Sequence, residues 1–186
     1  MRLSLDRLKY PYVINIIVEN YKIKKKYSRM NIYLTTGTGE GPTTLAAFDS
    51  ALFNAGIANF NLIRLSSVIP PDATIVRPKG HTVPIEGEWG DRLYVVMAEY
   101  RTAEIGIEAC AGVGWVVEKE SGKGLFVEHE GTNKEKVARD IQSSLEALMA
   151  TRGVDYGEIH MELNGVMCED EPVCAMVVAV YKAESW

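Results

Sequence analysis

The fold of this chain is decided by the stretch NLIRLSSVIPP, residues 61–71. An apolar, β-prone run ends in two serines there. The two prolines that follow cannot continue a ladder inside a sheet. We therefore predict a strand that stops at Ser66 and Ser67.

A serine at such a stop can carry unusual chemistry. If the backbone is strained, the hydroxyl of Ser67 can attack the carbonyl of Ser66 and move the chain from nitrogen to oxygen. The ester then loses its acyl group by β-elimination, and the dehydroalanine left behind hydrolyses to a terminal pyruvoyl group and ammonia. On these residues alone the alternative is an ordinary turn, since Ser and Pro are common where a strand ends.

Two separated blocks of the sequence resemble the pyruvoyl-dependent arginine decarboxylases. The first, residues 39–67, has that family's order of helix, asparagine-containing lead-in, strand and Ser-Ser, with Pro-Pro after it. The second is LFVEHEG, residues 125–131, which is similar to the family's acid-bearing strand. The resemblance extends from about Met30 to Tyr181.

The resemblance implies a precursor that cuts itself between Ser66 and Ser67, with the pyruvoyl group made from Ser67. This group would decarboxylate L-arginine to agmatine and CO2, a step of polyamine biosynthesis, without pyridoxal phosphate. Its ketone would condense with the α-amino group, and the adjacent carbonyl would take up the electrons released with CO2. Glu128 would then protonate the α-carbon. Glu130 lies on the same face of the strand and is the alternative acid.

A helix is predicted from a cap at Thr43 to about Asn54. Leu45, Asp49 and Leu52 are spaced i, i+4 and i+7, which predicts one apolar face with a carboxylate in its middle. A buried carboxylate is costly without a partner. The sequence leaves two partners open, an arginine of the fold or of an oligomer contact, and a substrate.

The family resemblance selects the substrate. It implies that Asp49 receives the guanidinium of arginine, a planar cation that suits a carboxylate. Leu45, Leu52 and Phe60 would cover the methylene stem. The resemblance also implies that Asn61 assists self-cleavage, and an amide donor could stabilise the oxyanion formed at the carbonyl of Ser66. The alternative is that Asn61 only satisfies a backbone group at the start of the strand.

The rest of the chain predicts the fold class. We expect a strand over residues 31–36 that ends at the glycine-rich turn 37–42, a meander of strands over 92–101, 105–118 and 125–130, and strands over 158–163 and 173–182. A capping box at residues 132–135 begins a long amphipathic helix. This pattern favours one α+β domain, a layered α/β sandwich with a mainly antiparallel sheet core. The resemblance adds assembly into trimers or hexamers, with the active site between protomers.

Charge divides the chain into two parts. Residues 1–29 have a net charge of +6, which leaves −11 for residues 30–186. An acidic body is a poor partner for nucleic acid and favours a small cationic substrate. We expect residues 1–29 to be a basic extension, either an extra strand or a disordered tail, or else an over-extended start before Met30. Residues 30–186 would form the decarboxylase domain.

Several classes of protein are disfavoured. The apolar run at residues 13–18 is too short for a membrane span and has no cleavage site for export. Three cysteines without metal-type spacing suggest a reducing cytoplasm. The histidines form no HExxH motif, so no metal is expected.

Two alternative functions remain open from the sequence. One is a pyruvoyl decarboxylase of another amino acid, such as aspartate, although an anionic substrate would need Arg or Lys in place of Asp49. The other is an uncleaved, non-catalytic oligomeric paralogue in which Ser66 and Ser67 are inert.

Overall fold

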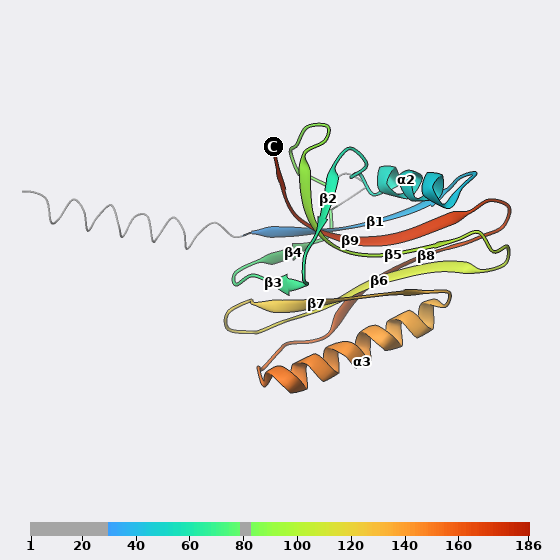
Figure 1. Ribbon diagram of the computed structural model, residues 1–186. Coiled ribbons are helices and arrows are strands. Elements are labelled where there is room, and N and C mark those ends of the chain that lie inside the picture. The colour runs from blue at the N-terminus through green and yellow to red at the C-terminus, as the bar shows by residue number, and fades with distance from the viewer. Residues whose placement is uncertain (1–29, 79–82) are drawn as a thin grey trace, which may run out of the picture.

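The computed structural model describes residues 30–78 and 83–186, and the predicted basic extension over residues 1–29 lies outside them. Two sheets pack face to face, and one helix covers the outer face of each (Figure 1). This is the layered α/β sandwich of mainly antiparallel strands that the sequence predicts. Within the described residues, no helix has the length and apolar character needed to cross a membrane.

The first sheet has five strands, with β9 at its centre. Their order is β2 (Asn61–Arg64), β5 (Arg92–Thr102), β9 (Val173–Glu184), β1 (Asn31–Glu40) and β4 (Thr74–Val76). The three long strands are antiparallel, whereas the short edge strands β2 and β4 run parallel to their neighbours. The side chains of β9 are buried from Val173 to Tyr181, because this strand has apolar layers on both faces.

The second sheet has four antiparallel strands. Their order is β3 (Val68–Ile69), β7 (Gly124–Gly131), β6 (Glu108–Val117) and β8 (His160–Met167). The predicted meander is wrong in one respect, since β5 lies in the first sheet while β6 and β7 pair in the second. The chain turns at Gly106, with φ of 82°, and β6 then packs across the sandwich from β5.

Helix α3 (Lys134–Arg152) covers the second sheet, as its apolar stripe predicts. Asn133 caps its start and accepts a hydrogen bond from the backbone N–H of Lys136 at 2.7 Å. Gly153 ends it with φ of 61°. The helix buries Val137, Ile141 and Leu145 against the sheet.

Helix α2 (Thr44–Asn54) covers the first sheet through small residues. Thr43 caps it as predicted, but its buried face is formed by Ala47, Ala51 and Leu52. The glycines expected to form a turn lie inside β1 instead. A Cβ atom on Gly37 would lie 2.1 Å from the carbonyl oxygen of Ala51. Glycine is therefore needed because the backbones of strand and helix approach closely, and no side chain fits between them.

This close approach makes Gly39 sensitive to substitution. A Cβ atom there would lie 2.2 Å from the carbonyl oxygen of Ala47. We expect Gly39→Ala to lower the free energy of unfolding by about 1–3 kcal/mol, because α2 must move away from the sheet. Urea unfolding followed by circular dichroism measures this. Gly131→Ala is the matched control, since its Cβ would meet only Val137 Cγ2, at 3.9 Å. Equal unfolding midpoints for the two variants would contradict the expectation.

Candidate active site

The two serines lie where the chain crosses from one sheet to the other. β2 ends at Arg64, and the backbone N–H of Leu65 donates to the carbonyl of Val95 at 2.8 Å. β3 begins at Val68 in the second sheet. Ser66 is exposed and Ser67 is half-buried. The predicted strand end is therefore also the point at which the chain changes layer.

Ser67 has a left-handed backbone conformation, with φ of 61°. This conformation costs a non-glycine residue roughly 1–3 kcal/mol and persists only where the surroundings hold it. Two contacts hold it here. The Ser67 hydroxyl donates a hydrogen bond to the carboxylate of Glu128. The Ser67 carbonyl accepts one from the backbone N–H of Phe126 at 2.8 Å. Strain is thus present at the bond predicted to break.

Glu128 comes from β7, the strand that pairs with β3. Its side chain is half-buried, whereas Glu130 is exposed two residues further along the same strand. Of the two carboxylates considered from the sequence, Glu128 is the one that contacts Ser67. The structure therefore brings the predicted nucleophile and the predicted acid together from positions 61 residues apart.

The predicted substrate-binding residues of α2 lie elsewhere. Leu45 and Asp49 are exposed on the outer face of the helix, while Leu52 is buried at the border of its packed face. The expectation of a carboxylate in the middle of a buried face is wrong, because the helix packs through its alanines. Asp49 therefore has access to water and needs no internal cation.

Phe60 precedes β2 and Asn61 is the first residue of that strand, at the opposite end from the serines. The Phe60 ring is half-buried beneath the backbone of Gly87. The Asn61 amide donates to the carbonyl of Gly90 at 2.5 Å, and the Trp186 indole donates to the same oxygen at 2.9 Å. In this protomer Asn61 satisfies a backbone group at the strand start, which is the alternative reading of the sequence. Its help in cleavage stays a prediction.

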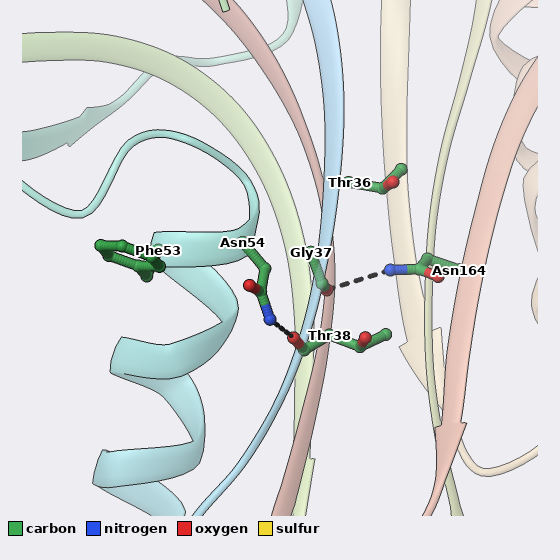
Figure 2. A pocket seen from close by; sticks show the side chains of 6 residues that line it. All are labelled: Thr36, Gly37, Thr38, Phe53, Asn54 and Asn164. Atoms are coloured by element: carbon green, nitrogen blue, oxygen red, sulfur yellow. Dashed lines mark hydrogen bonds between the residues drawn. The ribbon is translucent and has the colours of Figure 1, made fainter. Parts of the chain in front are cut away.

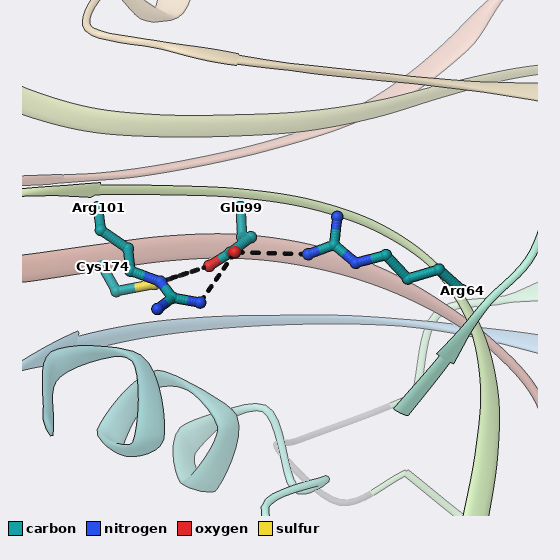
Figure 3. Close-up of polar contacts among 4 residues, drawn as sticks. All are labelled: Arg64, Glu99, Arg101 and Cys174. Atoms are coloured by element: carbon teal, nitrogen blue, oxygen red, sulfur yellow. Dashed lines mark hydrogen bonds and ion pairs between the residues drawn. The ribbon is translucent and has the colours of Figure 1, made fainter. Parts of the chain in front are cut away.

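A charged cluster lies between α2 and the first sheet (Figure 3). Glu99 accepts two hydrogen bonds from the Arg101 guanidinium, at 2.8 and 2.9 Å, and a longer one from Arg64 at 3.4 Å. The guanidinium of Arg101 also lies over the Phe48 ring, 3.7 Å from its centroid. Burial, and secondly the charge of Glu99, raise the pKa of the Cys174 thiol to about 12, so this thiol is unreactive. The carboxylate is balanced within the protomer, and the cluster fixes α2 on the sheet.

A pocket of about 550 Å³ lies beside β1, near the end of α2 (Figure 2). Its two amide side chains approach the strand from different elements. Asn54 donates to the carbonyl of Thr38 at 2.7 Å, and Asn164 donates to that of Gly37 at 3.0 Å and that of Met176 at 3.3 Å. Both amide nitrogens are therefore already bonded to backbone carbonyls of the sheet. None of the residues predicted from the sequence lines it.

Two groups beside Ser67 have no signature in the sequence motifs. One is the backbone N–H of Phe126. The other is the hydroxyl of Tyr181, which donates to the carbonyl of Val68 at 2.9 Å. A tyrosine at the end of a buried strand is a signal that a hydroxyl needs a partner, but the sequence does not say which one. Within the described ranges, no three His, Cys, Asp or Glu side chains gather as a metal site would require.

Comparisons with known proteins indicate the family of this chain. The family described as pyruvoyl-dependent arginine decarboxylase (PvlArgDC) matches residues 31–185. A relative named pyruvoyl-dependent arginine decarboxylase in Halobacterium salinarum is 38% identical over 152 residues, 81% of this chain and 92% of the relative. Two relatives of the same name are each 34% identical to this chain. The match to the one in Thermococcus kodakarensis covers 80% of this chain and 92% of the relative, and the match to the one in Methanopyrus kandleri covers 85% and 96%. With the strained Ser67 bound to Glu128, these matches show that the chain belongs to the pyruvoyl-dependent arginine decarboxylase family.

Proposed function

We propose that this chain is a precursor that cleaves itself between Ser66 and Ser67 and then decarboxylates L-arginine to agmatine and CO2, a step of polyamine biosynthesis. The observation that carries the proposal is the left-handed Ser67, whose hydroxyl is bound to Glu128. Wild-type protein is expected to run as two chains on a denaturing gel and to release CO2 from arginine. A single intact chain without turnover would refute the proposal.

Cleavage begins when the Ser67 hydroxyl oxygen attacks the carbonyl carbon of Ser66. The C–N bond between the two residues breaks, and an ester links Ser66 to the oxygen of Ser67. Loss of the Ser67 α-proton then expels the carboxylate of Ser66, and water converts the remaining dehydroalanine to a pyruvoyl group with release of ammonia. The contacts from Glu128 and Phe126 support the first step, because they hold the hydroxyl and the strained backbone in place.

The residues around Ser67 also fit the pyruvoyl group. The group supplies a ketone that captures the α-amino group and an adjacent carbonyl that draws electrons when CO2 leaves. The backbone N–H of Phe126 lies 2.8 Å from the carbonyl oxygen of residue 67 and donates to it, where negative charge would collect. Glu128, which contacts residue 67, is the group we propose to deliver the proton to the α-carbon. Neither pyridoxal phosphate nor a metal is needed for these roles.

We place the substrate between protomers of a trimer or hexamer. α2 lies on the outer face of the first sheet, whereas Glu128 lies in the second, so Asp49 and Glu128 of one protomer belong to different layers (Figure 1). A neighbouring copy would bring the two carboxylates together. Leu45 and Phe53 on α2 are 67% and 74% exposed, and such apolar side chains suit a surface that another protomer covers.

In this arrangement Asp49 binds the substrate guanidinium, while Leu45, Leu52 and Phe60 cover the methylene stem. We further propose that Asn61, which lies next to Phe60 at the start of β2, assists cleavage. We place the enzyme in the cytoplasm, where the three buried cysteines remain reduced, with no nucleic acid or membrane as partner.

Asp49→Asn tests substrate recognition. The variant keeps a similar side chain but loses the charge that attracts a guanidinium. We expect the KM for arginine to rise roughly 10- to 100-fold, because hydrogen bonds to charged groups contribute about 1.5–3 kcal/mol. Steady-state release of CO2 measures this. Asp155→Asn is the control, since that side chain is 85% exposed and forms a long ion pair with Lys119, at 3.8 Å. An unchanged KM for Asp49→Asn would remove Asp49 from the site.

A further inference from the structure

The carbonyl of Val68 lies at the edge of the second sheet. Among the strands of residues 30–78 and 83–186, β3 is the edge strand and pairs only with β7, with Val68 opposite Leu125. The Ser67 carbonyl points toward β7, because it accepts from the N–H of Phe126. In an antiparallel ladder the next carbonyl points the other way. The carbonyl of Val68 therefore faces away from β7, and no strand of the described part of the chain pairs with it on that side.

The hydroxyl of Tyr181 supplies a hydrogen bond to the Val68 carbonyl in place of a strand. Tyr181 comes from β9 in the first sheet, is 7% exposed, and belongs to the apolar layer between the sheets. Its hydroxyl donates to the Val68 carbonyl at 2.9 Å. Its ring packs edge-on against Phe126, with 6.3 Å between ring centroids. Tyr181 thus contacts both the residue that follows Ser67 and the residue whose N–H binds Ser67.

The hydroxyl of Tyr181 remains a donor at all ordinary pH values. Burial between the sheets, and secondly the negative charge of Glu128, raise its pKa above the usual range. A neutral phenol that must find a partner when buried is a dependable anchor for a carbonyl.

We propose that Tyr181 is a positioning residue, which holds the Val68 carbonyl so that residue 67 stays aligned with Glu128 after the chain is cut. This inference rests on the proposed function. Before cleavage, residue 67 is held from both sides by the chain. Afterwards it is a chain end, held by the hydrogen bonds from Phe126 to the backbone carbonyl of residue 67 and from Tyr181 to that of Val68. Alignment matters because a displacement of about 1 Å can cost 10²-fold in rate.

Tyr181→Phe tests this role, because it removes one hydroxyl and keeps the ring beside Phe126. We expect kcat, measured per pyruvoyl group, to fall about 10- to 100-fold, with KM within about twofold of wild type. Tyr94→Phe is the matched control. It removes an exposed tyrosine hydrogen bond of 2.8 Å to Glu184 from the same sheet, while the half-buried ring stays in place. The control is expected to match wild type in both constants.

A second readout does not depend on activity. In a Ser67→Ala background, which keeps the chain whole, Tyr181→Phe is expected to speed amide hydrogen exchange in residues 67–69, because the edge strand loses an anchor.

The outcomes separate this inference from the proposed function. If wild type cleaves and turns over arginine but Tyr181→Phe has the same kcat, the positioning role is overturned and the function stands. A lower unfolding temperature with an unchanged kcat also overturns it, since Tyr181 would then only stabilise the fold. If wild type neither cleaves nor decarboxylates, the proposed function fails and this inference fails with it.

Discussion

Ser67→Ala is expected to leave a single polypeptide of 20.6 kDa with no decarboxylase activity. Without the hydroxyl oxygen there is no attack on the carbonyl of Ser66, no ester and no pyruvoyl group. Wild type should instead give fragments of roughly 7 and 13 kDa, in proportion to the residues on either side of the cut. Intact mass and arginine turnover on the same preparations measure both effects.

The control for this variant is Ser121→Ala. Ser121 also donates its hydroxyl to a glutamate, Glu118, but in the turn between β6 and β7. That variant is expected to cleave and turn over arginine like wild type. A Ser67→Ala protein that still divided into two chains would show that the cut lies elsewhere. A carbonyl reactive toward hydroxylamine in that variant would show that the ketone has another source.

Glu128→Gln is expected to lower kcat about 10²- to 10⁴-fold, the usual contribution of a positioned acid. Glutamine keeps the size of the side chain but cannot supply the proton that the α-carbon needs. Turnover is best expressed per pyruvoyl group, titrated with hydroxylamine, so that any change in the extent of cleavage does not distort kcat. KM is expected to change little, because the lost interaction belongs to the chemical step.

Glu130→Gln tests which of the two carboxylates of β7 acts as the acid. The sequence places them on one face, but Glu130 is exposed while Glu128 contacts Ser67. The Glu130 variant is therefore expected to retain wild-type turnover. The opposite pattern, with turnover lost in Glu130→Gln and kept in Glu128→Gln, would move the acid to Glu130.

The elements with regular patterns could be predicted from the sequence. The stripe of Val137, Ile141 and Leu145 predicts α3 and its buried face, although the N-cap is Asn133, one residue after the Thr132 that opens the predicted capping box. The apolar run of β9 predicts a strand covered on both sides, and the structure has that strand at the centre of the first sheet, buried on both faces. In each case the local pattern and the final packing agree.

Prediction failed where packing between distant segments overrides the local pattern. Gly37 and Gly39 indicate a turn when read alone, but they lie in β1 because α2 needs close approach there. Because α2 makes this contact through Ala47 and Ala51, Leu45 and Asp49 face outward. The apolar spacing of Leu45 and Leu52 therefore predicted the wrong buried face. The strands β5 and β6 follow each other in the sequence like a meander, yet face each other across the sandwich.

The pairing of Ser67 with Glu128 was accessible only through the family resemblance, because nothing in their spacing brings them together. Phe126 contributes a backbone N–H, which every residue except proline has, so its role depends wholly on the fold. The hydroxyl of Tyr181 depends on the packing of one sheet on the other.

The order of strands in the first sheet has a consequence for the mature protein. β1 lies between β9 and β4, and β2 lies beside β5, so the two strands described between residues 30 and 66 are hydrogen-bonded to strands that follow the cut. A nick at this position breaks one covalent bond but leaves two interleaved polypeptides. The smaller piece cannot dissociate without tearing the sheet, so both pieces are expected to co-purify and to separate only on denaturation.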